Sequence, residues 1–277
     1  MLGKLIKHEF RATGRTMLPV MGALLVLALL ANLSIRGMTG GLSDVPILKI
    51  FYILIVIFFG VAIVASIVIA VVIMVSRFYR NLLKDEGYLM FTLPVSTHAL
   101  IWSKLIVSLL WFLLTALLIF LVMSLTALNL SNSNLKMIIE QFPSWQEITR
   151  FLREAGIRNE IITLMFQVIL GILLGAITTC LHFYAAMALG HMFTKDKVLL
   201  SIVFFIGISF LFSLLSTFYG FVGFGPRMAE HLDSMENTGA LRTFSTLMWH
   251  GIVISAIQGA LLYLATILGL KKGLNLE

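Results

Sequence analysis

Few residues in this sequence combine the type and the spacing that catalysis requires. His8 and Glu9 resemble the start of a zinc-protease helix, but the position for the second histidine, four residues after the first, is Ala12. Ser209 could serve as a nucleophile with His250 as its base, although a serine in an apolar helix usually bonds to its own backbone. We therefore expect no catalytic residue, and we expect that the chain is not an enzyme.

The sequence also offers little for phosphate or metal binding. It contains no G-x-x-x-x-G-K-[ST] motif, the loop that holds ATP phosphates through its backbone amides. His182 and His191 could bind a metal ion or shuttle protons, but no carboxylate partner is evident for them, so packing roles are favoured. No charged residue lies near the centre of an apolar run, which argues against an ion-coupled carrier. We expect this chain to bind no cofactor and no metal.

The most informative polar segment covers residues 78–95 and lies between two long apolar runs. A helix is expected to continue as far as Gly87, and Ser96 can cap the helix that follows. An apolar cluster bordered by charge usually marks a partner site, and the alternative is a loop that inserts its aromatic side chains into the membrane surface. The candidate docking residues are Lys84, Asp85, Glu86, Gly87, Tyr88, Leu89, Phe91, Leu93 and Pro94.

Residues 1–15 predict an amphipathic helix at the membrane surface. The apolar residues Leu5, Ile6 and Phe10 share one face of this helix. The rest of its surface carries the basic residues Lys4, Lys7, Arg11 and Arg15. Such a helix is attracted to anionic lipid, and the same basic residues also serve as a positive flank that fixes membrane topology.

The elements that position these segments are those of a membrane protein. Of the 277 residues, 60% are hydrophobic and 12% are charged, and the mean hydropathy is +1.02. A water-soluble globule of this size needs a more polar surface. Six runs reach the length of about 20 residues that a membrane-spanning helix needs. The predicted helices cover residues 16–35, 50–76, 100–128, 162–192, 198–222 and 245–270, in an all-α, polytopic, single-domain membrane protein.

Two details within the predicted helices concern packing. Lys104 near the start of the third helix is expected to extend its ammonium group to the membrane surface. Gly171 and Gly175 in the fourth helix have the spacing that lets two helix backbones approach closely. This glycine pattern is common in membrane helices and identifies no function.

The distribution of charge predicts the orientation of the chain. With the N-terminus in the cytoplasm, the cytoplasmic segments hold 12 of the 20 basic residues and 5 of the 13 acidic residues, and therefore the whole net charge of +7. Cytoplasmic loops of membrane proteins carry such an excess of Lys and Arg. Both termini are then cytoplasmic, residues 129–160 and 223–242 form extracellular loops, and the basic surplus requires no nucleic acid.

The segment between the second and third helices resembles that of the permease subunits of ABC-2 type transporters. The resemblance rests on three stretches, Lys84-Asp85-Glu86-Gly87-Tyr88-Leu89, Thr92-Leu93-Pro94-Val95-Ser96 and Ser103-Lys104-Leu105. Elsewhere it is one of topology: an amphipathic N-terminal helix, six spanning helices and a cytoplasmic coupling helix between the second and third.

The resemblance implies a permease that moves its substrate with ATP hydrolysed by a separate subunit. Two copies of this ATPase subunit would bind ATP and Mg²⁺, and a second permease subunit would form a homodimer or heterodimer with this chain. Glu86 would make polar contacts with the ATPase, and Tyr88, Leu89 and Phe91 would fill an apolar groove on it. The implied location is the bacterial cell membrane, and the implied activity is export of an amphiphilic or peptide-like substrate. The alternative function is a secondary transporter or channel that ATP does not drive.

Overall fold

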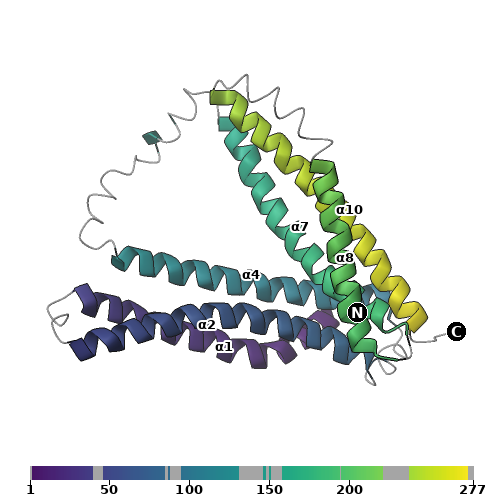
Figure 1. The fold of residues 1–277 in the computed structure, drawn as a ribbon, viewed down its shortest axis with the longest axis horizontal. Helices are drawn as coiled ribbons and strands as arrows, with labels where there is room; N and C mark the ends of the chain where they lie inside the picture. Colours follow the sequence, from purple (N-terminus) through teal and green to yellow (C-terminus); the bar gives the residue numbers. More distant parts are fainter. Residues whose placement is uncertain are drawn as a thin grey trace. The chain divides into compact units, whose positions relative to one another are not determined.

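The computed structural model describes residues 2–39, 46–84, 87, 95–130, 146–147, 150, 158–193, 195–220 and 237–273. The described part of the chain is helical and contains no strand (Figure 1). Its helices are α1 (Leu2–Thr39), α2 (Pro46–Phe78), α4 (Thr97–Leu130), α7 (Arg158–Gly190), α8 (Lys197–Tyr219) and α10 (Asn237–Gly273). A π-helical segment, η2 (Tyr79–Leu83), continues α2.

Among the described residues, six helices are long and apolar enough to cross a membrane, as the sequence predicted. The most apolar stretches of these helices have mean hydropathies between 2.0 and 3.2. The 33 residues of α2 extend over about 50 Å at 1.5 Å per residue, whereas the hydrocarbon layer is about 30 Å thick. The ends of such helices therefore reach the headgroup layers or pass beyond them.

The helix boundaries differ from the predicted ones mainly at the loops. Helix α4 continues to Leu130, α7 begins at Arg158 and α10 begins at Asn237, so each takes residues from the predicted loops 129–160 and 223–242. Helix α8 ends at Tyr219, and residues 221–222 of the predicted fifth helix lie outside the described residues. Hydropathy locates the apolar centre of a span but not its polar ends, which helical hydrogen bonds extend.

Large apolar side chains lie on the outside of these helices. Phe58 is 62% exposed, Phe120 67% and Phe218 69%. A soluble protein rarely leaves so much contiguous apolar surface in contact with water. Lipid is the solvent that this surface fits, which agrees with a multi-pass membrane protein.

The chain divides into two compact units. The first contains α1, α2 and α4 from Ala99 onward, and the second contains residues 78–98 together with α7, α8 and α10. The division places the polar segment between α2 and α4 in the second unit, although the chain on both sides of it belongs to the first.

In the first unit, α1 and α4 run parallel and α2 runs antiparallel to both. Hydrogen bonds join α1 to α4 near both ends of α1, between residues that are 95 and 94 positions apart in the sequence. Two apolar clusters fill the space between the three helices. One contains Leu24, Ala28, Ala31, Phe59 and Val122, and the other contains Met17, Ala70, Val107 and Trp111.

In the second unit, α7 runs parallel to α10 and antiparallel to α8. Hydrogen bonds join α7 to α10 between residues that are 82 and 78 positions apart. The residues of α7 that contact α8 include His182 and Gly190, which lie next to Ser209 and Ser201. The later residue of α7 contacts the earlier residue of α8, which is the order found in a helical hairpin.

Helix α1 is continuous from Leu2 to Thr39, with Pro19 inside it, and no break separates residues 2–15 from the membrane span. Ile6 packs against the cluster around Met17, and the ring of Phe10 stacks on Trp111 with centroids 4.8 Å apart. Leu5 is half-buried. Two of the three predicted apolar residues thus contact other helices of the first unit, and the location of this segment at a membrane surface stays a prediction.

Candidate functional site

The candidate site is the segment between α2 and α4. Lys84, Gly87 and the residues flanking the segment are described, whereas Asp85, Glu86, Tyr88, Leu89, Phe91, Leu93 and Pro94 lie outside the described residues. The helix that continues α2 ends at Leu83, four residues before the predicted limit, and Gly87 is itself helical. The structure describes the residues at both ends of this segment.

The end of α2 changes from α-helical to π-helical hydrogen bonding before the chain turns. The amide of Lys84 donates to the carbonyl of Tyr79 at 3.2 Å, and the amide of Gly87 donates to the carbonyl of Lys84 at 2.7 Å. A Cβ atom at position 87 would lie 2.7 Å from the carbonyl oxygen of Leu82, so only glycine fits this turn. Short π-helical segments of this kind occur frequently at functional sites.

Aromatic contacts hold the start of the segment against α7. The ring of Phe78 stacks on the ring of Tyr184, with centroids 4.0 Å apart and planes 10° apart, and both residues are completely buried. Tyr79 meets His191 edge to face at 5.2 Å. The ammonium group of Lys84 lies 5.4 Å from the centroid of the Tyr79 ring, within cation–π range.

The other end of the segment is held against α10. In the first turn of α4, Nδ1 of His98 and the hydroxyl of Tyr263 form a hydrogen bond of 2.7 Å. Their rings lie 5.9 Å apart. The segment is therefore fixed at one end to α7 and at the other end to α10, through side chains of the second unit.

The surroundings of His191, just after the end of α7, favour its neutral form. Burial lowers its pKa from the ordinary value of 6.5, and the nearby charge of Lys197 acts in the same direction. Its hydrogen bond to the backbone carbonyl of Met187 opposes this change but does not overcome it. Because a carbonyl oxygen only accepts, Nδ1 carries the ring proton.

His182 and Ser209 lie 3.1 Å apart, so the polar neighbour of Ser209 is His182 and not His250, the partner named in the disfavoured alternative. The Ser209 hydroxyl donates to the carbonyl of Phe205 at 2.7 Å, and Nε2 of His182 lies 3.2 Å from the same carbonyl. A carbonyl cannot donate, so this nitrogen must carry a proton, which it shares with the Ser209 oxygen. A protonated nitrogen cannot act as a base toward Ser209, and the contact serves to join α7 to α8.

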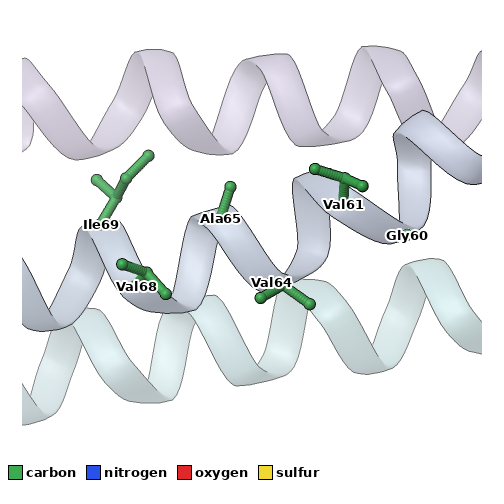
Figure 2. A pocket seen from close by; sticks show the side chains of 6 residues that line it. All are labelled: Gly60, Val61, Val64, Ala65, Val68 and Ile69. Carbon is green, nitrogen blue, oxygen red and sulfur yellow. The ribbon is translucent and has the colours of Figure 1, made fainter.

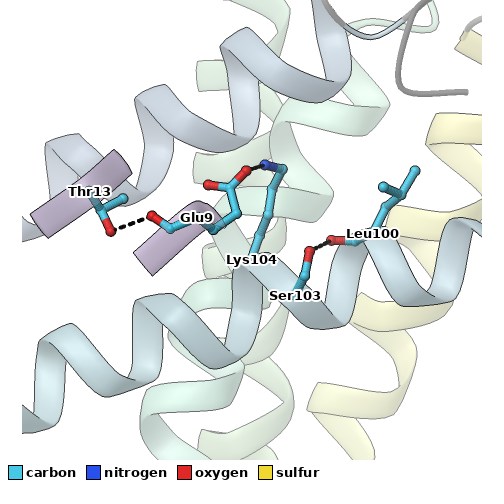
Figure 3. Close-up of polar contacts among 5 residues, drawn as sticks. All are labelled: Glu9, Thr13, Leu100, Ser103 and Lys104. Carbon is cyan, nitrogen blue, oxygen red and sulfur yellow. Dashed lines mark hydrogen bonds and ion pairs between the residues drawn. The ribbon is translucent and has the colours of Figure 1, made fainter. Parts of the chain in front are cut away.

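A buried ion pair joins α1 to α4 in the first unit (Figure 3). The ammonium group of Lys104 donates to the carboxylate of Glu9 at 2.5 Å, and the two side chains are 3% and 10% exposed. One turn further along α1, Thr13 accepts a 2.7 Å hydrogen bond from the indole of Trp111. Lys104 therefore does not extend to the membrane surface as expected, because a carboxylate lies within its reach inside the protein.

The glycines at helix contacts are not the ones that the spacing motif indicated. A Cβ atom at Gly171 or Gly175 would meet no other atom within 4 Å. By contrast, a Cβ atom at Gly269 would lie 2.8 Å from the backbone of Ala188, and one at Gly190 would lie 2.5 Å from the backbone of Ser201. Among the described residues, the backbone of another helix thus comes within 3 Å of such a Cβ atom at Gly190 and Gly269, which no local pattern distinguishes. A packing role of Gly171 and Gly175 stays a prediction.

A shallow apolar groove of about 500 Å³ lies on α2 (Figure 2). Its lining residues are Gly60, Val61, Val64, Ala65, Val68 and Ile69. None of them has a polar side chain, so the groove offers no group for catalysis or for recognition of a polar ligand. Among the described residues no cluster of His, Cys, Asp and Glu could hold a metal ion.

Comparison with known proteins identifies no relative of this chain. No model of a protein family, no curated protein and no solved structure matches it.

Proposed function

We propose that this chain is the membrane-spanning permease subunit of an ATP-binding-cassette exporter whose ATPase is a separate polypeptide. The observation that carries the proposal is the attachment of the segment between α2 and α4. Phe78 at its start stacks on Tyr184 of α7, and His98 at its end bonds to Tyr263 of α10. A force on this segment would reach α7 and α10 through packed side chains, and α2 and α4 through the backbone.

The sequence between these anchors supports a docking role. It combines charge at Asp85 and Glu86 with an apolar run that includes Tyr88, Leu89 and Phe91. Apolar side chains bordered by charge are typical of a surface that binds another protein. This is also the stretch in which the chain resembles ABC-2 type permeases.

The proposed mechanism is mechanical. Two copies of the ATPase subunit would close around ATP and Mg²⁺ and pull on the docked segment. A second permease subunit, identical or homologous, would complete the pathway. ATP binding would then shift the population between two arrangements of the spanning helices, which give access to opposite sides of the membrane. The proposed cargo is amphiphilic or peptide-like, since uncharged, aromatic and methionine side chains dominate the helices.

Charge reversal at Glu86 tests the proposal. E86K should leave membrane insertion intact and lower ATP-dependent transport, because it places like charge against the surface that is proposed to bind Glu86. The control is E277K, the same reversal at another acid that is predicted to face the cytoplasm. Purification of the chain with an ATPase subunit, and loss of transport in E86K but not in E277K, would support the proposal. Unchanged transport by E86K, or purification without any nucleotide-hydrolysing protein, would contradict it.

The buried pair of Glu9 and Lys104 favours a secondary transporter as the second candidate. Ionisable side chains buried among membrane-spanning helices often belong to proton or ion pathways. The pair lies about two turns from the start of α1 and of α4. Transport driven by an ion gradient in vesicles that contain only this chain would establish the second candidate and exclude the first.

A further inference from the structure

The first turns of α1 carry a basic stripe, defined as Lys4, Lys7, Arg11 and Arg15. All four side chains are exposed. At 100° per residue, they fall within a sector of roughly 80° around the helix axis. The buried residues Glu9, Thr13 and Met17 occupy the opposite side of the helix.

Contacts with α4 fix the rotation of α1 and therefore the direction of the stripe. Lys104 binds Glu9 and Trp111 binds Thr13, so these two side chains cannot leave α4 without losing buried polar contacts. Glu9 is the only acidic residue in α1. Because Lys104 neutralises it, no acid within the helix offsets the charge of the basic stripe.

The same side of α1 faces lipid further along the helix. Leu18, Leu25 and Leu29 continue the angular sector of the stripe and are 63%, 45% and 63% exposed. The boundary between headgroups and hydrocarbon therefore lies between Arg15 and Leu18. The lipid molecules whose chains contact these leucines have their headgroups beside Arg15 and Arg11.

Lys4 and Lys7, the part of the stripe nearest the start of α1, lie within reach of the electrostatic potential of the headgroup layer. Lys4 is about 17 Å further along the helix axis than Arg15, and the headgroup layer is about 5–8 Å thick. Lys4 and Lys7 thus lie in water, about one Debye length of 8–10 Å from the headgroups, where the negative potential of an anionic leaflet still acts.

We propose that the basic stripe is a binding site for the headgroups of anionic phospholipids in the leaflet that α1 enters. A topological signal requires only that basic residues lie near the end of a span. A topological signal does not require that the four charges align with the lipid-exposed side of the helix, and here all four do. The proposal does not depend on the transported substrate or on ATP.

The test compares two pairs of charge-removing substitutions in the full chain. K7Q/R11Q removes the centre of the stripe, and the control K271Q/K272Q removes two exposed lysines at the end of α10. Each protein is placed in phosphatidylcholine vesicles that contain spin-labelled phosphatidylglycerol or spin-labelled phosphatidylcholine. The measurement is the preference for the anionic lipid among the immobilised lipids, at low and at high salt. Orientation is checked by labelling a cysteine at position 271 in a C180S background of the wild-type and K7Q/R11Q chains.

The wild-type chain should prefer the anionic lipid, and high salt should weaken this preference. In K7Q/R11Q the preference should fall about five-fold through the loss of Arg11, the factor that corresponds to about 1 kcal/mol for a basic residue near an anionic surface. The loss of Lys7 should lower it by a smaller factor, because Lys7 lies about one Debye length from the headgroups. The control K271Q/K272Q should lose much less, and K7R/R11K should keep the preference. An equal loss in K7Q/R11Q and K271Q/K272Q would overturn the proposal. So would displacement of the labelled lipid by a soluble acidic peptide at equimolar amount, since the stripe would then be a protein-binding surface.

Discussion

At the scale of single residues, the pair of Glu9 and Lys104 has the largest consequence for stability. Both side chains are withdrawn from solvent, and each compensates the charge of the other. Replacing a buried ion pair by apolar residues is often neutral, whereas removing one partner leaves a buried charge without compensation. The stability of the first unit therefore depends on keeping or losing both charges together.

K104M should lower the free energy of unfolding by about 3–5 kcal/mol, because it removes the ammonium partner of a carboxylate that is withdrawn from solvent. The double variant E9M/K104M should recover most of this loss. The measurement is denaturant-induced unfolding of the purified protein in mild detergent, followed by circular dichroism. If K104M and the wild-type protein unfold at the same denaturant concentration, the pair does not stabilise the fold.

At the scale of helices, packing in the second unit depends on glycines where two backbones meet. Gly269 of α10 lies against the backbone of Ala188 in α7, where even one added methyl group would come within 2.8 Å. Backbone atoms cannot move aside as the end of a flexible side chain can. Gly171, also in α7, has open space in place of a neighbouring helix.

G269A should therefore destabilise the protein by about 1–3 kcal/mol, the usual cost of overpacking. The matched control is G171A, which adds the same methyl group to the same bundle without a clash and should not destabilise, because alanine favours helix more than glycine does. Unfolding in detergent measures both variants. Equal destabilisation by G269A and G171A would contradict the assignment of the contact. Loss of a dimer in G171A alone would instead place a second copy against α7.

The six helices could be predicted because each depends on a local property, a run of apolar residues of sufficient length. The contacts between helices could not. Glu9 and Lys104 are 95 positions apart, and nothing near either residue indicates the other. For the same reason, the sequence did not indicate His182 as the polar neighbour of Ser209, because only the packing of α7 against α8 brings the two side chains together.

The sequence indicated where the candidate site lies in the chain, but it did not indicate which helices the site contacts. Charge and apolar residues around Gly87 indicated a docking segment. The sequence also contains the residues that make these contacts from the segment, since Phe78, Tyr79 and His98 are aromatic residues at its two ends. Their partners on α7 and α10 lie about 100 or more positions further along the chain, beyond the reach of local spacing.

At the scale of the whole molecule, the attachment of residues 78–98 within the second unit bears on how the chain would work. The backbone of this segment continues α2 and α4, whereas its side chains contact α7 and α10. A partner that moves the segment would act on four of the six spanning helices at once. Weakening one anchor should separate the movement of the segment from the movement of α10.

Y263F removes the hydroxyl that binds His98 but keeps the ring that packs beside it. Under the proposed function, this variant should assemble with the ATPase subunit and hydrolyse ATP, because the docking residues are unchanged. Transport per ATP hydrolysed should fall several-fold, because a lost hydrogen bond of about 0.5–1.5 kcal/mol weakens the link to α10. The measurement is the ratio of transport to hydrolysis in reconstituted vesicles, with Y219F as the control for removal of a tyrosine hydroxyl elsewhere in the second unit. A ratio that stays at the wild-type value in Y263F would show that the anchor on α10 carries no movement, and the segment would then act through α7 or through α2 and α4 alone.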